Sequence, residues 1–569
     1  MVFTVLFIVS IMGYFIFYRK IIGGKAAEFP LLFIACSVVF VYILGLIGML
    51  ALGYYVLLTA GLILLPVAIC KTEKTSRMKL GGLFLDPAII FLIIGCIWVR
   101  FVTRDVGVSN PDDFSHWYRL CKVLYYDNSF PLTQEIQYTT YPPGTAVWIY
   151  IITKSFGFSI ANCFTAQSAI IISSVCMFFC VIPEKSSSGK KILCWLYIVA
   201  SYLILSSATV SNFALIVDGV LGFVALGCVV FVLNNKHKKS YFLLMFLLTF
   251  LVTIKFSGLL FSLFVCVIYF FTVHTSKTIL KTVALLLTPI GLSLLYRVRN
   301  SLVLKNVDSS AHAVSIDRLM TIQKYKTDTF KNYIAVKTIK QSASFFGTFV
   351  GNNQVKLIWL SFFGLLLIAL FEKINKSEKD NHRSGVFKVL VISFIFYWVY
   401  VVFLILTYIF SMTHFEAYHL ASYYRYMGTV AVLMLGIFSF SLLRILAKQT
   451  SIVVYPLIIS YVLLSMLSIS NYDFILGGIY YSPYDRWLDY PWVALNSVAE
   501  EGKIYTEDSY LVIWDQSIWD GYKLPDFCLT NIEMTFFRSC NVNHIIVDTA
   551  QYNNTNNVDY DHVVVVYSL

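Results

Sequence analysis

Two adjacent carboxylates, Asp112 and Asp113, stand in the longest polar interval of the first half of the chain. His116 follows them by three and four positions, so a helix starting here would turn its ring back towards both acids. These side chains could accept a proton from a hydroxyl group, or bind a divalent cation such as Mg²⁺ or Mn²⁺. Pro111 followed by two acids is also a typical helix start, so a plain N-terminal cap is the alternative interpretation.

Basic residues at the ends of apolar segments are the second set of candidates. Lys255 interrupts one apolar stretch, Arg297 and Arg299 end another, and Arg425 opens a third. Ionisable residues at membrane depth are costly and often functional, and these four could hold a phosphate group. Anchoring at the membrane surface is the alternative for each of them. Tyr141, in a polar break further along the first interval, joins His116 as a candidate substrate-binding residue.

The composition places these residues in a membrane protein. The chain has 569 residues, of which 58% are hydrophobic and 13% charged, whereas soluble domains carry about 25% charged residues. The formal charge of +12 comes from basic residues clustered in short loops, which suits contact with membrane lipids and not with nucleic acid. The twelve cysteines form no CxxC pair and are expected to be small apolar residues.

Hydrophobic segments predict about fourteen transmembrane helices, because a span needs about 20 apolar residues. They are expected at about 2–18, 30–48, 51–70, 87–103, 160–182, 192–211, 213–233, 241–254, 258–273, 278–297, 355–371, 386–411, 421–444 and 452–469. Two of them, within 241–273, are short. Asp218 lies at the edge of one span and is expected to be solvated.

The loops between these spans give an orientation. Every second loop is basic, at about 19–25, 71–79, 185–191, 236–239, 277–281, 373–388 and 444–448. Basic loops face the cytoplasm, so both termini and the long loops 104–159 and 298–354 are expected outside. The loop 298–354 could be a flexible lid or a passive connector. In a shorter outer loop, His414, Glu416 and His419 could bind a metal, although three polar residues on a wet loop are the commoner case.

The first outer loop is expected to contain two helices lying on the membrane surface. Residues 113–127 place Phe114, Trp117, Leu120, Cys121 and Leu124 on one helical stripe, which is typical of an amphipathic helix at the headgroup level. Residues 145–157 are apolar but too short to span comfortably. A span there would also invert the orientation of all later loops.

The tail after residue 470 has the polarity of a soluble domain. Short β-prone runs at 503–506, 511–514, 544–548 and 562–567, with a helix at 531–540, predict a small extracytoplasmic α/β domain. Cys528 and Cys540 could form a disulfide there. The expected domains are therefore the N-terminal helices 1–86, a membrane module 87–469 and the tail 470–569.

The motifs together resemble a known family. Asp112-Asp-Phe-Ser-His-Trp117 in the first large outer loop, the Tyr141-Pro-Pro-Gly144 break, Lys255-Phe-Ser-Gly258 and Ser422-Tyr-Tyr-Arg-Tyr426 resemble elements of the GT-C superfamily of integral membrane glycosyltransferases. The resemblance covers about residues 87–444. It departs from the usual family pattern because three additional spans precede the span that leads into the acidic loop.

The resemblance implies a hexosyl- or pentosyltransferase that acts at the extracytoplasmic face of the cell membrane. The donor would be a sugar on a polyprenyl phosphate, and the acceptor a glycan, a lipid-linked molecule or a cell-envelope polysaccharide. Asp112 would be the base and Asp113 would assist it, while Arg425 would contact the carrier phosphate. Two alternatives remain: a polymerase or ligase that uses polyprenyl-diphosphate-linked oligosaccharides, and a transporter of lipid-linked glycans.

Overall fold

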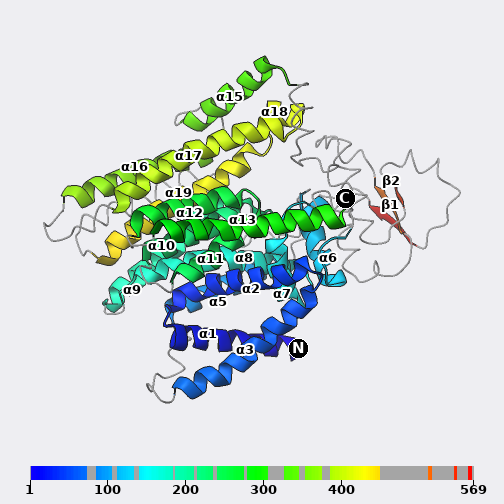
Figure 1. Ribbon diagram of the computed structural model, residues 1–569, viewed down its shortest axis with the longest axis vertical. Coiled ribbons are helices and arrows are strands. Elements are labelled where there is room, and N and C mark those ends of the chain that lie inside the picture. Colours follow the sequence, from blue (N-terminus) through cyan, green and yellow to red (C-terminus); the bar gives the residue numbers. More distant parts are fainter. Residues whose placement is uncertain are drawn as a thin grey trace.

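The chain folds as a bundle of helices that run largely alongside one another (Figure 1). The computed structural model describes residues 2–72, 85–104, 112–132, 140–183, 186–209, 214–234, 240–273, 278–304, 326–344, 353–374 and 385–448, together with the backbone of three short strands.

The helices of the first half are α1 (Val2–Phe17), α2 (Phe29–Leu46), α3 (Leu50–Thr72), α5 (Pro87–Val102), α6 (Tyr118–Asp127), α7 (Gly144–Phe156), α8 (Ile160–Cys176), α9 (Ser188–Ser207), α10 (Val217–Asn234) and α11 (Ser240–Ile254). Those of the second half are α12 (Gly258–Thr272), α13 (Thr278–Val303), α15 (Asp328–Ala343), α16 (Asn353–Ile374), α17 (Gly385–Phe410), α18 (His414–His419) and α19 (Tyr423–Lys448). Shorter helical turns precede α2 at Ala26–Glu28 and follow α8 at Met177–Val181.

The chain is a multi-pass helical membrane protein. Ten helices in the described part of the chain are long and apolar enough to cross a membrane, and three shorter apolar helices, α5, α11 and α12, accompany them. Each of these helices coincides with a span expected from the sequence. The expected span 452–469 lies outside the described residues, so the total of fourteen stays a prediction.

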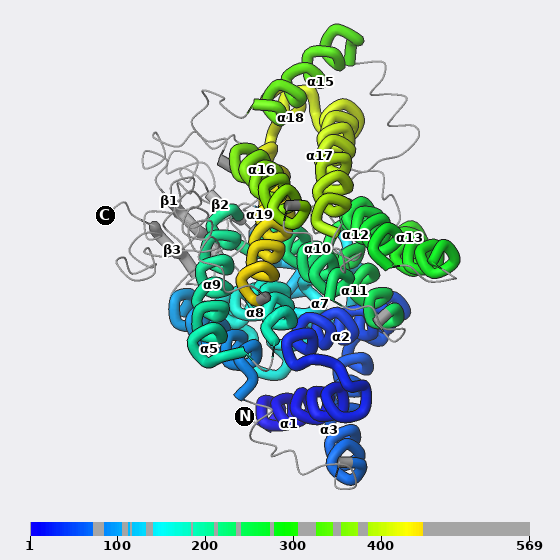
Figure 2. The backbone as a smooth tube through the Cα atoms, turned by 90° about the vertical axis from the view of Figure 1, so that its left-hand side faces the viewer, coloured from blue at the N-terminus to red at the C-terminus, as the bar shows by residue number. Residues whose placement is uncertain are grey.

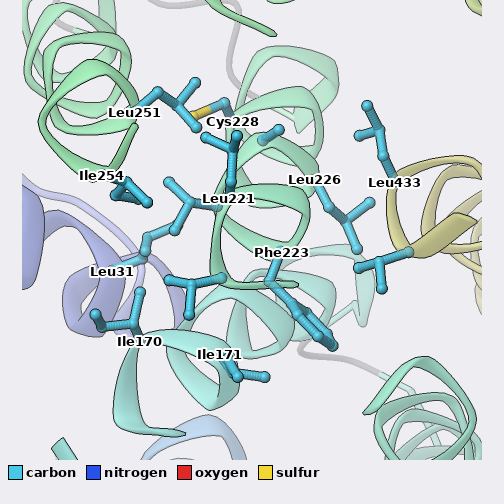
Figure 3. Packing of buried hydrophobic residues seen from close by; sticks show 14 of the residues in the cluster. Leu31, Ile170, Ile171, Leu221, Phe223, Leu226, Cys228, Leu251, Ile254 and Leu433 are labelled. Carbon is cyan, nitrogen blue, oxygen red and sulfur yellow. The ribbon is translucent and has the colours of Figure 1, made fainter. Parts of the chain in front are cut away.

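Helix α10 lies at the centre of the bundle. Nearly all of its side chains are buried, because it packs against α8, α11 and α19 at once. Figure 3 shows Leu221, Phe223 and Leu226 of α10 between Ile171 of α8 and Leu433 of α19. A helix that is apolar all round needs such a position. Any polar residue on α10 is therefore held in the interior unless it lies at a helix end.

Helix α2 packs within the bundle against α7, α8 and α11, whereas α1 and α3 lie at one edge of it, and Figure 2 shows α1 and α3 below α2. They are tied to the rest by hydrogen bonds at one end. Thr4 donates to the carbonyl of Ser155 at 2.8 Å, and the hydroxyls of Tyr54 and Ser155 lie 3.0 Å apart. The N-terminal helices thus support the C-terminal turn of α7.

The prediction that two helices of the first outer loop lie on the membrane surface is wrong for α7. Its side chains are buried on every side, because α7 fills a space bounded by α2, α6, α8 and α11. Helix α6 is amphipathic as expected, but its apolar stripe packs against α7 and not against lipid; Trp117, Leu120, Cys121 and Leu124 are all buried. The periodicity identified the buried face and could not tell which partner would cover it.

Three short strands are described in the tail: β1 (Tyr510–Trp514), β2 (His544–Ile546) and β3 (His562–Val566). They pair in parallel in the order β2-β1-β3. Each coincides with an expected strand, while the expected strand 503–506, the helix 531–540 and the pair Cys528 and Cys540 lie outside the described residues. The α/β domain as a whole therefore stays a prediction.

Candidate active site

A cluster of four charged side chains lies where the N-terminal ends of α10 and α19 meet the turn between α11 and α12. The residues are Asp112, Asp218, Lys255 and Arg425. Nζ of Lys255 lies 2.7 Å from Oδ1 of Asp218, and Nε of Arg425 lies 3.1 Å from Oδ2 of the same carboxylate. Nη1 of Arg425 also contacts Oδ2 of Asp112. We call these four residues the charged cluster, and the end of the bundle that carries it the site end.

The charged cluster is graded in exposure. The side chain of Asp218 is 6% exposed, that of Lys255 17%, that of Arg425 25% and that of Asp112 36%. Asp218 therefore lies deepest and Asp112 is the most accessible member. The prediction that Asp218 is solvated is wrong, because α19 and the α11–α12 turn cover the first turn of α10.

Helix packing fixes the position of Asp218 and Arg425. The hydroxyl of Thr429 on α19 donates to the backbone carbonyl of Asp218 at 3.0 Å. This bond joins α10 and α19 one turn beyond Arg425. The ring of Tyr426 lies 5.0 Å from Nζ of Lys255 and 5.6 Å from the guanidinium carbon of Arg425. The tyrosine thus offers a cation–π contact to both cations of the cluster.

The two acids of the first loop have different environments. Asp113 is fully buried, and both of its carboxylate oxygens accept the N–H of Leu215 at 3.0 Å. Burial raises the pKa of Asp113 well above the usual carboxyl range; the Leu215 N–H opposes this shift and the charge of Asp112 adds to it. Asp113 thus ties the first outer loop to the segment before α10, which leaves Asp112 to face Arg425.

His116 and Tyr141 form an aromatic group with Trp117. The ring centroids of His116 and Tyr141 are 5.5 Å apart, and those of His116 and Trp117 are 4.3 Å apart. Burial lowers the pKa of His116 to about 3, and the positive charge of Lys255 adds to the shift. His116 therefore stays neutral at physiological pH and lies within the electrostatic reach of Lys255.

Two glycines of the sequence motifs allow close packing beside Lys255. A Cβ on Gly144, at the end of Tyr-Pro-Pro-Gly, would lie 2.3 Å from Oγ1 of Thr253. A Cβ on Gly258 would lie 2.1 Å from the carbonyl oxygen of Leu251, and Ser262 donates to the carbonyl of Leu248 across the same hairpin. Larger residues would push α7 and α12 away from the end of α11, on which Lys255 depends for its position.

The two arginines at the end of α13 have different roles. The guanidinium of Arg297 lies 4.7 Å from the ring centroid of Phe256, the residue after Lys255, so it is near the charged cluster. Arg299 instead donates to the backbone carbonyls of Pro131 and Phe130 at 2.9 and 3.3 Å. Arg299 thus holds the segment that follows α6.

The metal-binding interpretations find no support in the placement of the side chains. Within the described ranges, no group of three or more His, Cys, Asp or Glu residues is placed to hold a metal ion. Asp113 directs both oxygens at Leu215, and His116 packs edge-to-face against Trp117 and Tyr141. In the shorter outer loop, His414 stacks on Phe330 with centroids 3.9 Å apart, and Glu416 caps α18.

The described part of the loop 298–354 is docked on the bundle. Nζ of Lys326 donates to the carbonyls of Tyr408, Ile409 and Met412 at the end of α17. The hydroxyls of Ser342 on α15 and Tyr423 on α19 lie 2.8 Å apart, two residues from Arg425. The C-terminal end of α15 is therefore tied to the first turn of α19.

Sequence reasoning placed Asp112, Lys255 and Arg425 as candidates, and the structure brings all three together. It missed Asp218, their common partner. The available signal was an acid in the first turn of an otherwise apolar span, the kind of residue whose default interpretation is functional. No family model, curated protein or solved structure matches the chain.

Proposed function

We propose that the chain is a membrane glycosyltransferase of the GT-C type that moves a sugar from a polyprenyl-phosphate carrier to an acceptor hydroxyl. The acceptor would be an extracytoplasmic glycan, a lipid-linked molecule or a cell-envelope polymer. The observation that carries the proposal is the charged cluster itself. Four ionisable residues from four separate segments meet at one end of a membrane bundle, and Asp112 remains the most accessible of them.

The cations of the cluster suit a phosphate leaving group. Arg425 and Lys255 lie on opposite sides of the Asp218 carboxylate, so their charges are held close together. Arg425 offers a planar fork that fits phosphate oxygens, and Lys255 offers a compact point charge. Arg297, beside Phe256, supplies a further positive charge near the same place.

Asp112 suits the role of general base. It contacts Arg425 at Nη1, whereas Asp218 contacts the guanidinium at Nε. A donor phosphate that approaches Arg425 would compete with Asp112 for this contact and would release the carboxylate towards the acceptor. Asp218, which is deeper and paired with both cations, would keep them in place.

The transfer step then follows. Asp112 accepts the proton of the acceptor hydroxyl while the oxygen of that hydroxyl forms a bond to the anomeric carbon. The bond between that carbon and the phosphate oxygen breaks, and the polyprenyl phosphate leaves with the electron pair. Arg425 and Lys255 stabilise the charge that develops on the leaving oxygen. Asp113 contributes by fixing the position of the first outer loop, which carries Asp112. No step uses a metal ion, and transfer in the presence and absence of a chelator tests whether one is required.

The orientation supports an extracytoplasmic site. The charged cluster lies at the ends of α10, α11 and α19 that are opposite the basic loops, and basic loops face the cytoplasm. A cysteine introduced at Ser109, after replacement of the native cysteines, should react with a membrane-impermeant thiol reagent in intact cells. Labelling only after permeabilisation would place the cluster on the other side.

The activity test compares sugar transfer from a radiolabelled polyprenyl-linked donor in purified membranes. Asp112→Asn keeps the shape of the side chain and removes its basicity, so the rate should fall by about 10²- to 10⁴-fold. Asp328→Asn is the matched control, because Asp328 lies on α15 and its side chain is 93% exposed. Unchanged transfer by the Asp112→Asn, Asp113→Asn double variant would contradict the mechanism and would favour a ligase that relies on arginines, or a transporter.

A further inference from the structure

A cavity lies at the end of the bundle opposite the site end. Its volume is about 470 Å³, and it is bounded by the turns before α2 and after α8 and by the N-terminal ends of α5 and α9. Figure 2 shows α5 and α9 next to each other. Lys25, Pro87 and Pro183 are exposed at its rim, so the cavity opens to the surface. This size falls in the range of small-molecule sites.

The lining of the cavity is strongly basic. Among the lining residues that the structure describes, Arg19, Lys25 and Lys191 contribute three cations and Asp86 contributes one carboxylate. Asp86 already caps α5, because its Oδ1 accepts the N–H of Ala88 at 3.0 Å. Net positive charge therefore faces the cavity, and an anion would be attracted to it.

The cations are held in place by their own hydrogen bonds. Nη1 of Arg19 donates to the carbonyl of Gly24 at 2.7 Å, and Nζ of Lys25 donates to the carbonyl of Cys180 at 2.9 Å. Nε of Arg19 is buried, and no residue that the structure describes accepts a hydrogen bond from it. A buried donor of this kind favours a ligand that brings acceptor oxygens.

Helix dipoles add to the positive potential. Pro87, the first residue of α5, lines the cavity, and so does Lys191 in the first turn of α9. The N-terminus of a helix carries a partial positive charge, so Lys191 in the first turn of α9 is unfavourably placed by itself. A bound anion would offset this repulsion.

The remainder of the lining is apolar and includes Phe179, Val181 and Ile182. A free inorganic anion would make no apolar contact with these side chains. A phospholipid would contact the cations with its phosphate and the apolar side chains with its glycerol and acyl region. We propose that this cavity binds the phosphate of an anionic phospholipid of the cytoplasmic leaflet.

This inference is independent of the proposed function. Helix α5 joins the cavity to the loop that carries Asp112, and its 16 residues separate the two by about 24 Å at about 1.5 Å per residue. Loss of lipid binding would therefore leave the charged cluster in place, and failure of the sugar-transfer test would leave the cavity unaffected.

The test measures lipid retention by native mass spectrometry of the detergent-solubilised protein. Phosphatidylglycerol and phosphatidylcholine are added in separate arms, and a third arm adds inorganic phosphate as a competitor of phosphatidylglycerol. The wild-type protein should retain phosphatidylglycerol, and should retain phosphatidylcholine less. The Arg19→Gln, Lys191→Gln double variant should bind phosphatidylglycerol at least about tenfold more weakly, because each charge-assisted contact to phosphate contributes substantially.

Lys190→Gln is the matched control, since Lys190 neighbours Lys191 but does not line the cavity; it should bind phosphatidylglycerol as the wild type does. If the double variant unfolds, the single variant Lys191→Gln replaces it, with unchanged gel-filtration behaviour as the criterion. Equal retention by wild type and variant would overturn the proposal. Equal competition by inorganic phosphate would also overturn it, because it would identify a site for the free anion.

Discussion

Lys255 and Asp218 form an ion pair of 2.7 Å between the turn that ends α11 and the first turn of α10. Both side chains are largely buried, and Arg425 contacts the same carboxylate from the other side. A single buried acid thus holds two cations whose mutual repulsion would otherwise separate them. The stability of this arrangement and the phosphate binding that we propose for it therefore involve the same three side chains.

The pair predicts a measurable coupling. Asp218→Asn should lower the thermal midpoint in detergent because Lys255 loses its carboxylate, and Lys255→Met should lower it because Asp218 keeps only Arg425. The double variant should lose less than the sum, with a coupling of about 0.5–3 kcal/mol. A double-mutant cycle from thermal unfolding measures this, and strict additivity would show that the ion pair contributes nothing.

Arg425 should be essential for donor binding. Arg425→Ala should raise the apparent donor KM or lower turnover by about 10- to 150-fold, as expected for loss of a charge-assisted contact. Arg425→Lys should rescue only part of the loss, because an ammonium cannot contact two oxygen partners in one plane. Wild-type kinetics in Arg425→Ala would move the phosphate site to Lys255 and Arg297.

His116 predicts an acid-sensitive fold. Its pKa is about 3 in the folded protein and about 6.5 when the chain is unfolded. The unfolded chain therefore binds a proton first, so the contribution to stability is complete above about pH 6.5 and is lost as the pH falls towards 3.

The thermal midpoint of the wild-type protein should consequently fall as the pH is lowered from about 7.5 to about 5. His116→Gln should reduce that fall, since glutamine does not titrate. His419→Gln, at an exposed histidine, is the control and should leave the fall unchanged. A His116→Gln variant as acid-sensitive as the wild type would assign the effect to other groups.

Gly144 should be intolerant of even one methyl group. In Gly144→Ala the new Cβ would lie 2.3 Å from Oγ1 and 2.5 Å from the carbonyl oxygen of Thr253, so α7 must move away from α11. We expect a loss of about 1–3 kcal/mol, with reduced sugar transfer because Lys255 follows Thr253 by two residues. Gly291→Ala is the control, since nothing lies within 4 Å of its Cβ position. Equal unfolding midpoints for both variants would contradict the close contact.

The sequence identified those residues whose free-energy cost in the membrane does not depend on their packing partners. An arginine or lysine at the end of an apolar span is expensive wherever the span packs, so Arg425 and Lys255 could be identified without a partner. The identity of the partner depends on which helix ends meet. Asp218 meets Lys255 because α10 packs against α11. The sequence shows an acid in the first turn of an apolar span, but it does not show which cation will pair with it.

Helix α7 shows what the sequence could not predict about packing. An apolar segment of 13 residues satisfies the length rule for a surface helix, and the charge pattern correctly argued against a span. Whether protein or lipid covers it depends on the space left by α2, α8 and α11, which are far apart in the sequence. Arg299 is a similar case, because its carbonyl partners Phe130 and Pro131 come from a segment without any distinguishing motif.

The order in which the chain is made sets the order in which the charged cluster can form. Asp218 enters the membrane within an apolar helix, and its first cation, Lys255, follows only 37 residues later, at the end of the next helix. Arg425 is separated from Asp112 by 313 residues. Asp218 and Lys255 can therefore pair during synthesis, as soon as nascent α10 and α11 form a hairpin. Asp112 can pair with Arg425 only after α19, the last described helix of the bundle, has been made. A chain interrupted before α19 would contain the ion pair of Asp218 and Lys255 but would lack Arg425 and therefore the complete cluster.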